Sequence, residues 1–362
     1  MLENNYLFSF LQKHKVRISV IAAYIGLLAA MLWIPPLMRF VPKNSQSLNI
    51  IIFPEVVSIE MLRGFTEETG ITVHARHVEG DAEMCTYLND ENNAYDAVCI
   101  PEYLIPELER TKIVSPLSKS LIPNYQKLHP MFKTENPEPT SIPFSWALFG
   151  LGVDTKQLPF PGIPSWSIIF QPLPYKICVS DDPRSLILMG ALGLGFSTET
   201  LTKKELFAIC AELAKQKQHV ELYSDTNIAL LFANRIVPLA FASYQSVALA
   251  NKYNPDAKFI IPQEGAVRIA QNWIIPTNST KKELAHSLIN YMLSTKVSTI
   301  LKEDTEFLPT NRKKLEEYWT DTEQNSSNCP LPSEEIIKNA HLAPSNLSPK
   351  LLSSFWITLK NT

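Results

Sequence analysis

The residue types that carry catalysis and metal binding are present in this chain, but their spacing does not assemble a reactive site. The sequence contains no Gly-x4-Gly-Lys-Ser/Thr phosphate-binding loop and no Gly-x-Ser-x-Gly nucleophile motif. His74 and His77 are three residues apart in an expected strand, so they point to opposite faces and cannot easily chelate one metal ion. The glycines at 190, 193 and 195 lie within and after an expected helix, whereas a phosphate-binding loop needs them between a strand and a helix. We therefore predict no enzymatic activity, no metal site and no cofactor.

The chain has 5 cysteines, an odd number that would leave at least one thiol unpaired in an oxidising compartment. Cys178 lies in an apolar strand-like run and Cys210 in a helical run, so we interpret both as small buried hydrophobic residues. Cys85 and Cys99 could pair, and the sequence leaves that question open.

The composition is that of a folded protein with room for two cores. The 362 residues are 45% hydrophobic and 19% charged, and single cores stop growing near ~250 to 300 residues. The formal net charge of −3 offers no basic face for phosphate backbones, so we predict no nucleic-acid partner.

An apolar stretch without charged residues runs from residue 18 to residue 38. As a helix it is long enough to cross a hydrocarbon layer of ~30 Å. Lys13, Lys15 and Arg17 precede it and Arg39 and Lys43 follow it, so a slight excess of positive charge favours a cytoplasmic N-terminus and a body outside the membrane. The stretch is either a signal peptide that is removed or an anchor that stays, and we favour the anchor because no clear cleavage site follows. The expected parts are a cytoplasmic N-terminus at 1–17, a transmembrane or signal-anchor helix at 18–38 and a linker at 39–47.

The remaining chain alternates short β-rich runs with helical patterns. The first series predicts strands at 48–53, 71–77 and 94–100, with helices at 58–69, 81–89 and 106–110. After a Pro-rich region, the second series predicts strands at 176–180, 237–242 and 258–262, with helices at 184–192, 203–216 and 246–251. Two more helices are expected at 281–294 and 297–303. The βαβα order of the first series predicts a parallel sheet covered on both faces, and the two series together predict an α/β protein with two α/β units.

Several short runs along the body occur together in one order. They are Leu62-x-x-Phe65-x-x-Glu68-Thr69-Gly70-Ile71-x-Val73, Ala94-Tyr95-Asp96, Ser141-Ile142-Pro143-Phe144-x-Trp146, Ser165-Trp166, Ser180-Asp181-Asp182-Pro183-Arg184, Pro262-x-Glu264-Gly265, Ile274-Ile275-Pro276 and Pro309-Thr310-Asn311. In this order the chain resembles the periplasmic spermidine/putrescine-binding proteins of ABC import systems, a bacterial extracellular solute-binding family. Each run is short, and it is their shared order from residue 48 to about 315 that carries the resemblance.

The resemblance implies a two-lobed, type II-like periplasmic-binding-protein fold, to which the N-terminal transmembrane or signal helix is added. The ligand would lie in the cleft between the lobes, and a permease would recognise the form in which the lobes have closed around it. The implied parts are lobe 1 at 48–148 plus 274–312, lobe 2 at 149–273, and a C-terminal segment at 313–362 packing on the lobes. The implied partners are a small cationic, polyamine-like ligand and ABC permease subunits in the inner membrane, with the protein a monomer in the periplasmic space.

A polyamine site needs acceptors or carboxylates for each ammonium group and apolar or aromatic walls for the methylene chain. By the resemblance, Asp182 and Tyr103 match ligand contacts of the family, and Phe53 keeps an aromatic wall. Four other positions differ from the family. Ser185 and Gln271 stand where the family has carboxylates, Ser243 stands where it has a tryptophan, and Phe307 stands where it has a tyrosine. Glu55 would supply a compensating carboxylate if it faces the cleft.

Each of these residues also has an interpretation without a ligand. Asp182 precedes Pro183 and an expected helix, so it can be the N-cap of that helix. Phe53 can belong to the core, Tyr103 can pack its ring at an edge, and Glu55 can be a solvated loop acid. Because family aromatics and carboxylates are replaced, two other functions stay open: a diverged binding protein for another polar metabolite, and a membrane-anchored adaptor outside transport that retains the scaffold.

Overall fold

The computed structural model describes Tyr24 and residues 46–361, apart from 91–93, 160–161 and 325–328. The expected membrane or signal helix at 18–38 therefore lies outside the described residues, except for Tyr24. Within the described part of the chain, no helix is both long and apolar enough to cross a membrane. The chain divides into Met1–Gln46 and Ser47–Thr362, and the second unit contains every described strand.

The first lobe begins with three parallel strands in the spatial order β2-β1-β3. Its elements are β1 (Ser47–Ile52), α3 (Ile59–Thr69), β2 (Thr72–His77), α4 (Asp81–Asn89), β3 (Ala97–Pro101) and α5 (Ile105–Arg110). β1 is apolar and largely buried because it is the central strand of the three. Gly70 ends α3 with a φ of 73°, a left-handed conformation that glycine adopts without steric cost. The predicted strand and helix order of this part is confirmed.

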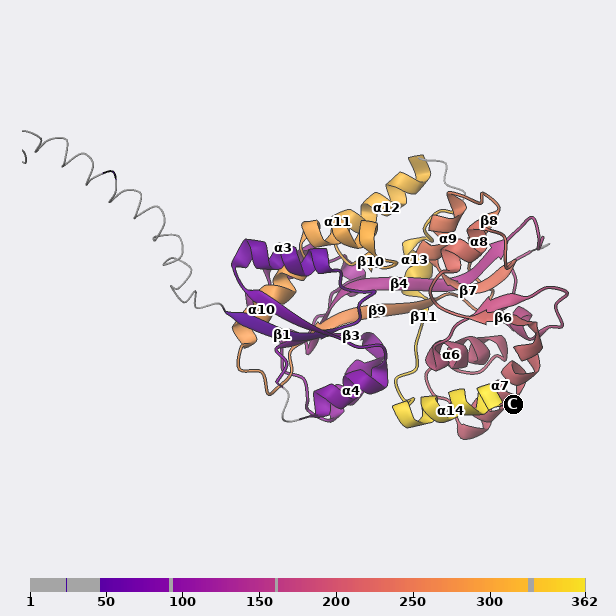
Figure 1. Cartoon of the computed structure of the whole chain (residues 1–362), viewed down its shortest axis with the longest axis horizontal. Helices are drawn as coiled ribbons and strands as arrows, with labels where there is room; N and C mark the ends of the chain where they lie inside the picture. The colour runs from indigo at the N-terminus through magenta and orange to yellow at the C-terminus, as the bar shows by residue number, and fades with distance from the viewer. Residues whose placement is uncertain (1–23, 25–45, 91–93, 160–161, 325–328, 362) are drawn as a thin grey trace, which may run out of the picture. The chain divides into compact units, whose positions relative to one another are not determined.

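Two long antiparallel strands join the first lobe to the second. They are β4 (Ser141–Asp154) and β9 (Val267–Ile274), paired from Ser141↔Ile274 to Phe149↔Val267. β9 pairs with β3 on its other side, and β4 pairs with β7, so a single sheet runs through both lobes in the order β2-β1-β3-β9-β4-β7-β5-β6. Figure 1 shows β4 and β9 running side by side between the two groups of helices. We call β4 and β9 the hinge strands.

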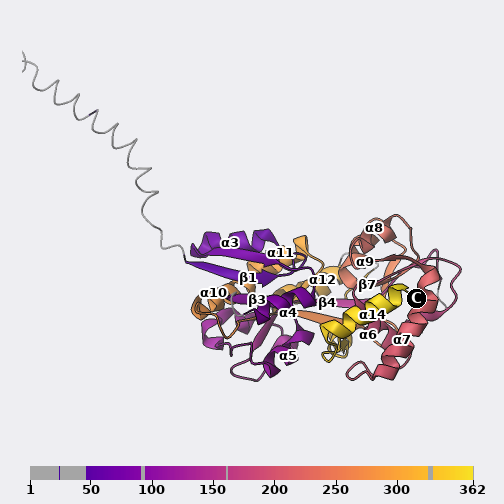
Figure 2. The ribbon, with the colours of Figure 1, turned by 60° about the horizontal axis from the view of Figure 1, so that its bottom comes forward.

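The second lobe is another α/β unit. Its strands are β5 (Ile177–Val179), β6 (Val220–Tyr223), β7 (Leu239–Ser243) and β8 (Ala257–Ile260), and its helices are α6 (Pro183–Gly193), α7 (Lys203–Gln216), α8 (Ile228–Ala233) and α9 (Tyr244–Asn251). β5 is parallel to both β6 and β7, as the βα order predicts. Figure 2 shows α6, α7, α8 and α9 gathered around these strands.

The last part of the chain returns to the first lobe and then covers the second. Its elements are α10 (Lys282–Met292), α11 (Thr295–Asp304), β10 (Leu308–Pro309), α12 (Arg312–Gln324), α13 (Glu334–Lys338), β11 (His341–Leu342) and α14 (Pro349–Asn361). Helices α10 and α11 pack against α3, whereas α14 packs against α6 and α7. Short 3-10 helices occur at η1 (Glu102–Leu104), η2 (Lys119–Leu121), η3 (Pro123–Lys127), η4 (Pro130–Phe132), η5 (Trp166–Phe170) and η6 (Lys217–His219).

The apolar residues form separate cores at the two ends of the sheet. One cluster in the first lobe is built around Ile50, Phe65 and Trp273. Two further clusters fill the second lobe and the segments packed on it, one including Phe241 and the other Phe232. Separate cores joined by two strands define a two-lobed α/β fold.

Several elements were not among those expected from the sequence, including β6, α8 and the C-terminal helices α12, α13 and α14. β6 is half exposed, with Glu221 and Leu222 both solvent-accessible, so it shows neither a continuous apolar run nor a clean alternation. α8 is only one to two turns long, too short for a periodic pattern. The open disulfide question is answered as well, because Cys85 and Cys99 are both free thiols.

Candidate functional site

Asp182 is the N-cap of α6 and binds donors at the start of that helix. Its Oδ1 accepts from the backbone N–H of Arg184 at 3.3 Å. Its Oδ2 accepts from the backbone N–H and the hydroxyl of Ser185, both at 2.8 Å. These bonds satisfy donors that an uncapped helix leaves unpaired. The N-cap interpretation of Asp182 is confirmed, and Ser185 is its direct partner.

Tyr103 lies at a contact between the lobes, under a buried arginine. Its ring packs against apolar residues of both lobes, and the guanidinium carbon of Arg184 lies 4.1 Å from the ring centroid. The Tyr103 hydroxyl donates to Asp81 Oδ1 at 3.3 Å, and Arg184 Nη2 lies 3.4 Å from Asp81 Oδ2. Asp81 and Tyr103 come from the first lobe and Arg184 from the second.

Burial dominates the electrostatics of this group. Arg184 is only 1% exposed, and it also donates to the carbonyl oxygens of Pro344 and Leu347. Burial raises the pKa of Asp81, while the positive charge of Arg184 opposes that rise. Burial also raises the pKa of Tyr103 well above its ordinary value, which keeps its hydroxyl a donor. We call Asp81, Tyr103 and Arg184 the interlobe cluster.

Ser243 takes part in a second contact across the hinge. It is the N-cap of α9, accepting from the backbone N–H of Ser246, and its hydroxyl donates to Glu306 Oε2 at 3.0 Å. The Ser246 hydroxyl donates to the same oxygen. Glu306 follows α11, and its neighbour Phe307 packs, half-buried, against the first-lobe core.

Gln271 lies on a hinge strand with unsatisfied polar atoms. Its Oε1 is buried without a hydrogen-bond partner, and so is the hydroxyl of Ser145, the residue directly opposite on β4. Both amide atoms of Gln245, the second residue of α9, are also buried and unpaired. α9 packs on β4. Buried polar groups are nearly always paired, so each of these atoms leaves a hydrogen-bonding position that a water molecule or a ligand can fill.

The two remaining candidates follow β1. Phe53 is 6% exposed and belongs to the first-lobe core, so its interpretation as a core residue is supported. Glu55 is on the surface, but nearby protein atoms desolvate its carboxyl group and raise its pKa. The proposed ligand contacts of both residues stay predictions.

An acidic edge lies beside Asp182. The Ser180 hydroxyl donates to Asp225 Oδ2 at 2.6 Å, and the Asp225 backbone N–H donates to Asp181 Oδ1 at 3.2 Å. Burial, with the neighbouring carboxylates of Asp181 and Asp182, raises the pKa of Asp225 to about 8. Among the described residues, no group of three or more His, Cys, Asp or Glu side chains is arranged to hold a metal ion.

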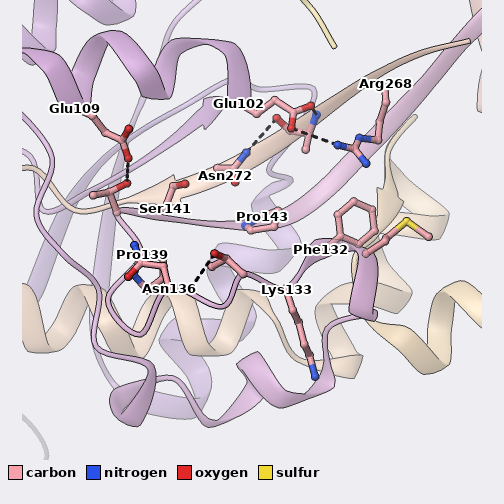
Figure 3. Close-up of a pocket in the computed structure, with 14 residues that line it drawn as sticks. Glu102, Glu109, Phe132, Lys133, Asn136, Pro139, Ser141, Pro143, Arg268 and Asn272 are labelled. Carbon is pink, nitrogen blue, oxygen red and sulfur yellow. Dashed lines mark hydrogen bonds and ion pairs between the residues drawn. The ribbon is translucent and has the colours of Figure 1, made fainter. Parts of the chain in front are cut away.

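A hollow of about 300 Å³ opens beside the hinge strands (Figure 3). Its β9 residues are Arg268, Ala270 and Asn272. Because side chains alternate along a strand, these point to the face opposite Gln271. Glu102, at the end of β3, accepts from the backbone N–H of Ala270 at 3.0 Å and faces Arg268.

The structure thus groups the predicted residues unevenly. It brings Asp182, Ser185 and Tyr103 to the interlobe cluster and Ser243 and Phe307 to the second contact, and it leaves Gln271 with unpaired neighbours on the hinge. Sequence reasoning missed five residues of these groups, which are Asp81, Ser145, Arg184, Gln245 and Glu306. Arg184 belongs to a family-like run, which was the only available signal for it, whereas Ser145 occupies an unspecified position of another run and had none.

Two α/β lobes joined by a pair of hinge strands are the architecture of a class of ligand-binding receptors that close around their ligand. The sequence profile of the bacterial extracellular solute-binding proteins matches residues 100–328 of this chain. The chain belongs to that family.

Individual relatives agree with this assignment. The spermidine/putrescine-binding periplasmic protein of Escherichia coli is 26% identical over 302 residues, covering 82% of this chain and 86% of that protein. Its Salmonella typhimurium counterpart is 27% identical over 256 residues, covering 69% and 73%. A solved Listeria monocytogenes structure, provisionally named a spermidine/putrescine ABC transporter, superposes with a TM-score of 0.75 at 23% identity, covering 88% of this chain and 98% of that one. That structure shows the shared fold.

Proposed function

We propose that this protein is the extracytoplasmic binding component of a polyamine-type ABC importer. It captures a small cationic amine between its lobes and delivers it to permease subunits in the inner membrane. The names of the Escherichia coli and Salmonella typhimurium relatives support the ligand class and the periplasmic location. The protein acts by binding and release, as its solute-binding family does, and it needs no catalytic step.

The observation that carries this proposal is the set of unpaired polar atoms on the hinge. Ser145 and Gln271 lie on facing positions of β4 and β9, and neither Ser145 Oγ nor Gln271 Oε1 has a hydrogen-bond partner. A carbonyl and a hydroxyl oxygen can both accept from a ligand ammonium group. A ligand bound there would touch the strands that join the lobes, so its binding would be coupled to the angle between them.

The proposal includes a division of the chain into two lobes, a C-terminal segment and an N-terminal anchor. The lobes are residues 48–148 plus 274–312 and residues 149–273, and 313–362 packs on them. Residues 18–38 anchor the protein, as a monomer, to the outer face of the inner membrane. Glu55, Phe53 and Phe307 are proposed as further contacts from the first lobe.

One observation favours a second candidate, a binding protein for another polar metabolite. The nearby carboxylates already have internal partners: Asp81 has Arg184, Asp182 has the start of α6, and Glu306 has two serines. The unpaired atoms of Ser145, Gln245 and Gln271 belong to neutral groups. Such a site would hold a singly charged or uncharged polar molecule more readily than a triamine.

A thermal-shift panel separates these candidates from the adaptor. Putrescine, spermidine, spermine, amino acids and thiamine are added to the purified full-length chain at increasing concentration. A true ligand stabilises the folded state by RT ln(1 + [L]/Kd), so the midpoint rises with its concentration. We expect the largest rise with putrescine. A rise with only another compound supports the second candidate, and no rise with any compound overturns the receptor proposal.

A further inference from the structure

The hollow in Figure 3 is separate from the proposed ligand site because it lies on the other face of the hinge strands. Gln271 on β9 and its partner Ser145 on β4 point to one face of the sheet. Arg268, Ala270 and Asn272 alternate with Gln271 along β9 and so point to the other face. Its lining also includes η4 and the segment that follows it, together with Glu102 and Glu109. The function proposed above uses none of the residues that line it.

Arg268 is the one lining cation whose charged group remains available in this hollow. Its side chain is 15% exposed, its Nε is buried without a partner, and Nη2 lies 3.8 Å from Glu102 Oε2. That separation is longer than a hydrogen bond. The other lining cation, Lys133, donates its ammonium to the Gln126 carbonyl at 2.9 Å and points away from the hollow in Figure 3.

Glu102 brings an opposite charge to the same end of the hollow. Its side chain is 20% exposed, and Oε1 accepts only the backbone N–H of Ala270. Burial raises the pKa of Glu102, while Arg268 lowers it. The two groups therefore form an ion pair at 3.8 Å without a hydrogen bond between them, so each keeps hydrogen-bonding positions that a ligand can use.

We propose that this hollow is a second binding site, and that its ligand is a zwitterionic α-amino acid with a small side chain. The ligand carboxylate would receive a bidentate pair of bonds from Arg268, whose planar fork matches a carboxylate. The ligand ammonium would lie against Glu102. Both charges of the ligand then meet opposite charges on adjacent side chains, whose nearest atoms are 3.8 Å apart.

The walls fit the rest of such a molecule. A volume of about 300 Å³ lies at the lower end for small-molecule sites, which limits the ligand to a small one. Phe132, Pro143 and Ala270 give an apolar wall, and the Phe132 ring lies 5.8 Å from the Arg268 guanidinium. Glu109 is already occupied by the Thr140 hydroxyl at 2.5 Å, so it does not compete for the ammonium.

Calorimetric titration of the full-length chain tests this site. Each common L-amino acid is first screened by thermal shift, and the best one is then titrated together with its N-acetyl and carboxamide derivatives. We expect the amino acid to bind and both derivatives to fail, because each derivative lacks one of the two charges. Arg268→Gln and Glu102→Gln should each weaken binding about tenfold or more, whereas Lys133→Gln should leave it unchanged.

Putrescine titrated into the same proteins keeps this test independent of the function proposed above. Arg268→Gln should bind putrescine like the unmodified chain, and putrescine should not compete with the amino acid. If Arg268→Gln does not fold, Arg268→Lys replaces it, since lysine keeps the charge but loses the fork and should still bind about tenfold more weakly. The second site is ruled out if no amino acid binds, if Arg268→Gln or Arg268→Lys binds as tightly as the unmodified chain, or if putrescine displaces the amino acid.

Discussion

Asp182 illustrates how a residue can serve structure and site together. Both of its carboxylate oxygens bind the first turn of α6, yet the residue is close enough to Asp81 of the first lobe to raise its pKa. A cap at the lobe boundary fixes the start of α6, and with it the position of Arg184. A ligand that contacts Asp182 would therefore meet a carboxylate whose oxygens already accept hydrogen bonds from α6.

Replacing Asp182 with alanine should lower the free energy of unfolding by about 1 to 2 kcal/mol, because an N-cap is lost. Asp182→Asn is the matched control, since asparagine caps helices as well as aspartate does. Chemical denaturation measures both variants. Equal destabilisation by the two changes would show that charge, rather than capping, is what Asp182 contributes.

Asp225 should make stability depend on pH. Its pKa rises from 3.8 to about 8 in the folded state, so between these values the folded protein binds a proton that the unfolded chain has released. Stability should therefore fall as pH rises through this window, by up to about 1.4 kcal/mol per pH unit from this residue.

Asp225→Asn should flatten that dependence. The measurement is the difference between the unfolding free energies of the two proteins from pH 4.5 to 8.5, where the other carboxylates cancel. A difference that does not change with pH would mean that Asp225 is ionised throughout the range.

For individual residues, the sequence predicted hydrogen bonds between near neighbours in the chain better than contacts between residues that are far apart in it. The Asp182 cap was readable because the residue precedes a proline and a helix. The partners of Tyr103 were not, because Asp81 and Arg184 are 103 residues apart and meet only when the lobes do. The sequence also could not show that Gln271 Oε1 is unpaired, because this depends on the absence of a hydrogen-bond donor among all its neighbours in the fold.

At the scale of the elements, helices α8 and α9 pack closely on β4 because residue 152 of this strand is a glycine. A Cβ atom added at Gly152 would lie 2.6 Å from Cε2 of Phe232 on α8 and 3.0 Å from Cγ2 of Val247 on α9. These distances are shorter than van der Waals contact, and the surrounding core is closely packed.

Gly152→Ala should therefore lower the free energy of unfolding by about 1 to 3 kcal/mol, the usual cost of overpacking. Gly162→Ala is the control, since nothing lies within 4 Å of its added Cβ. Thermal unfolding compares the two. A Gly152→Ala variant as stable as the control would show that α8 and α9 shift freely on the hinge strand.

Elements with a clear apolar pattern were predictable whatever their length, whereas the 13-residue helices α12 and α14 were not expected. The strands of the first lobe and helices α6, α7 and α10 follow from apolar periodicity and end near the expected residues. β6, β10 and β11 have two to four residues and gain their structure from pairing with distant strands. No local pattern specifies such segments, because the hydrogen bonds that define them are long-range.

For the whole molecule, the interlobe cluster holds the lobes in contact through a buried ion pair. Arg184→Gln should lower the free energy of unfolding by about 3 to 5 kcal/mol, because Asp81 would keep a buried charge without its partner. The double variant Asp81→Asn/Arg184→Gln should lose less than the sum of the single variants. Additive losses in denaturant unfolding would show that the two side chains do not interact in solution.

Calorimetric titration of putrescine into the full-length chain and its Gln271→Ala variant tests whether the ligand binds on the hinge strands. One putrescine should bind per chain, and Gln271→Ala should weaken the affinity about tenfold or more because it removes the unpaired Oε1. Lys133→Gln, on the opposite face, should bind like the unmodified chain. Binding of equal strength in the Gln271→Ala variant, or no heat from the folded chain at any putrescine concentration, would contradict a ligand site on the hinge strands.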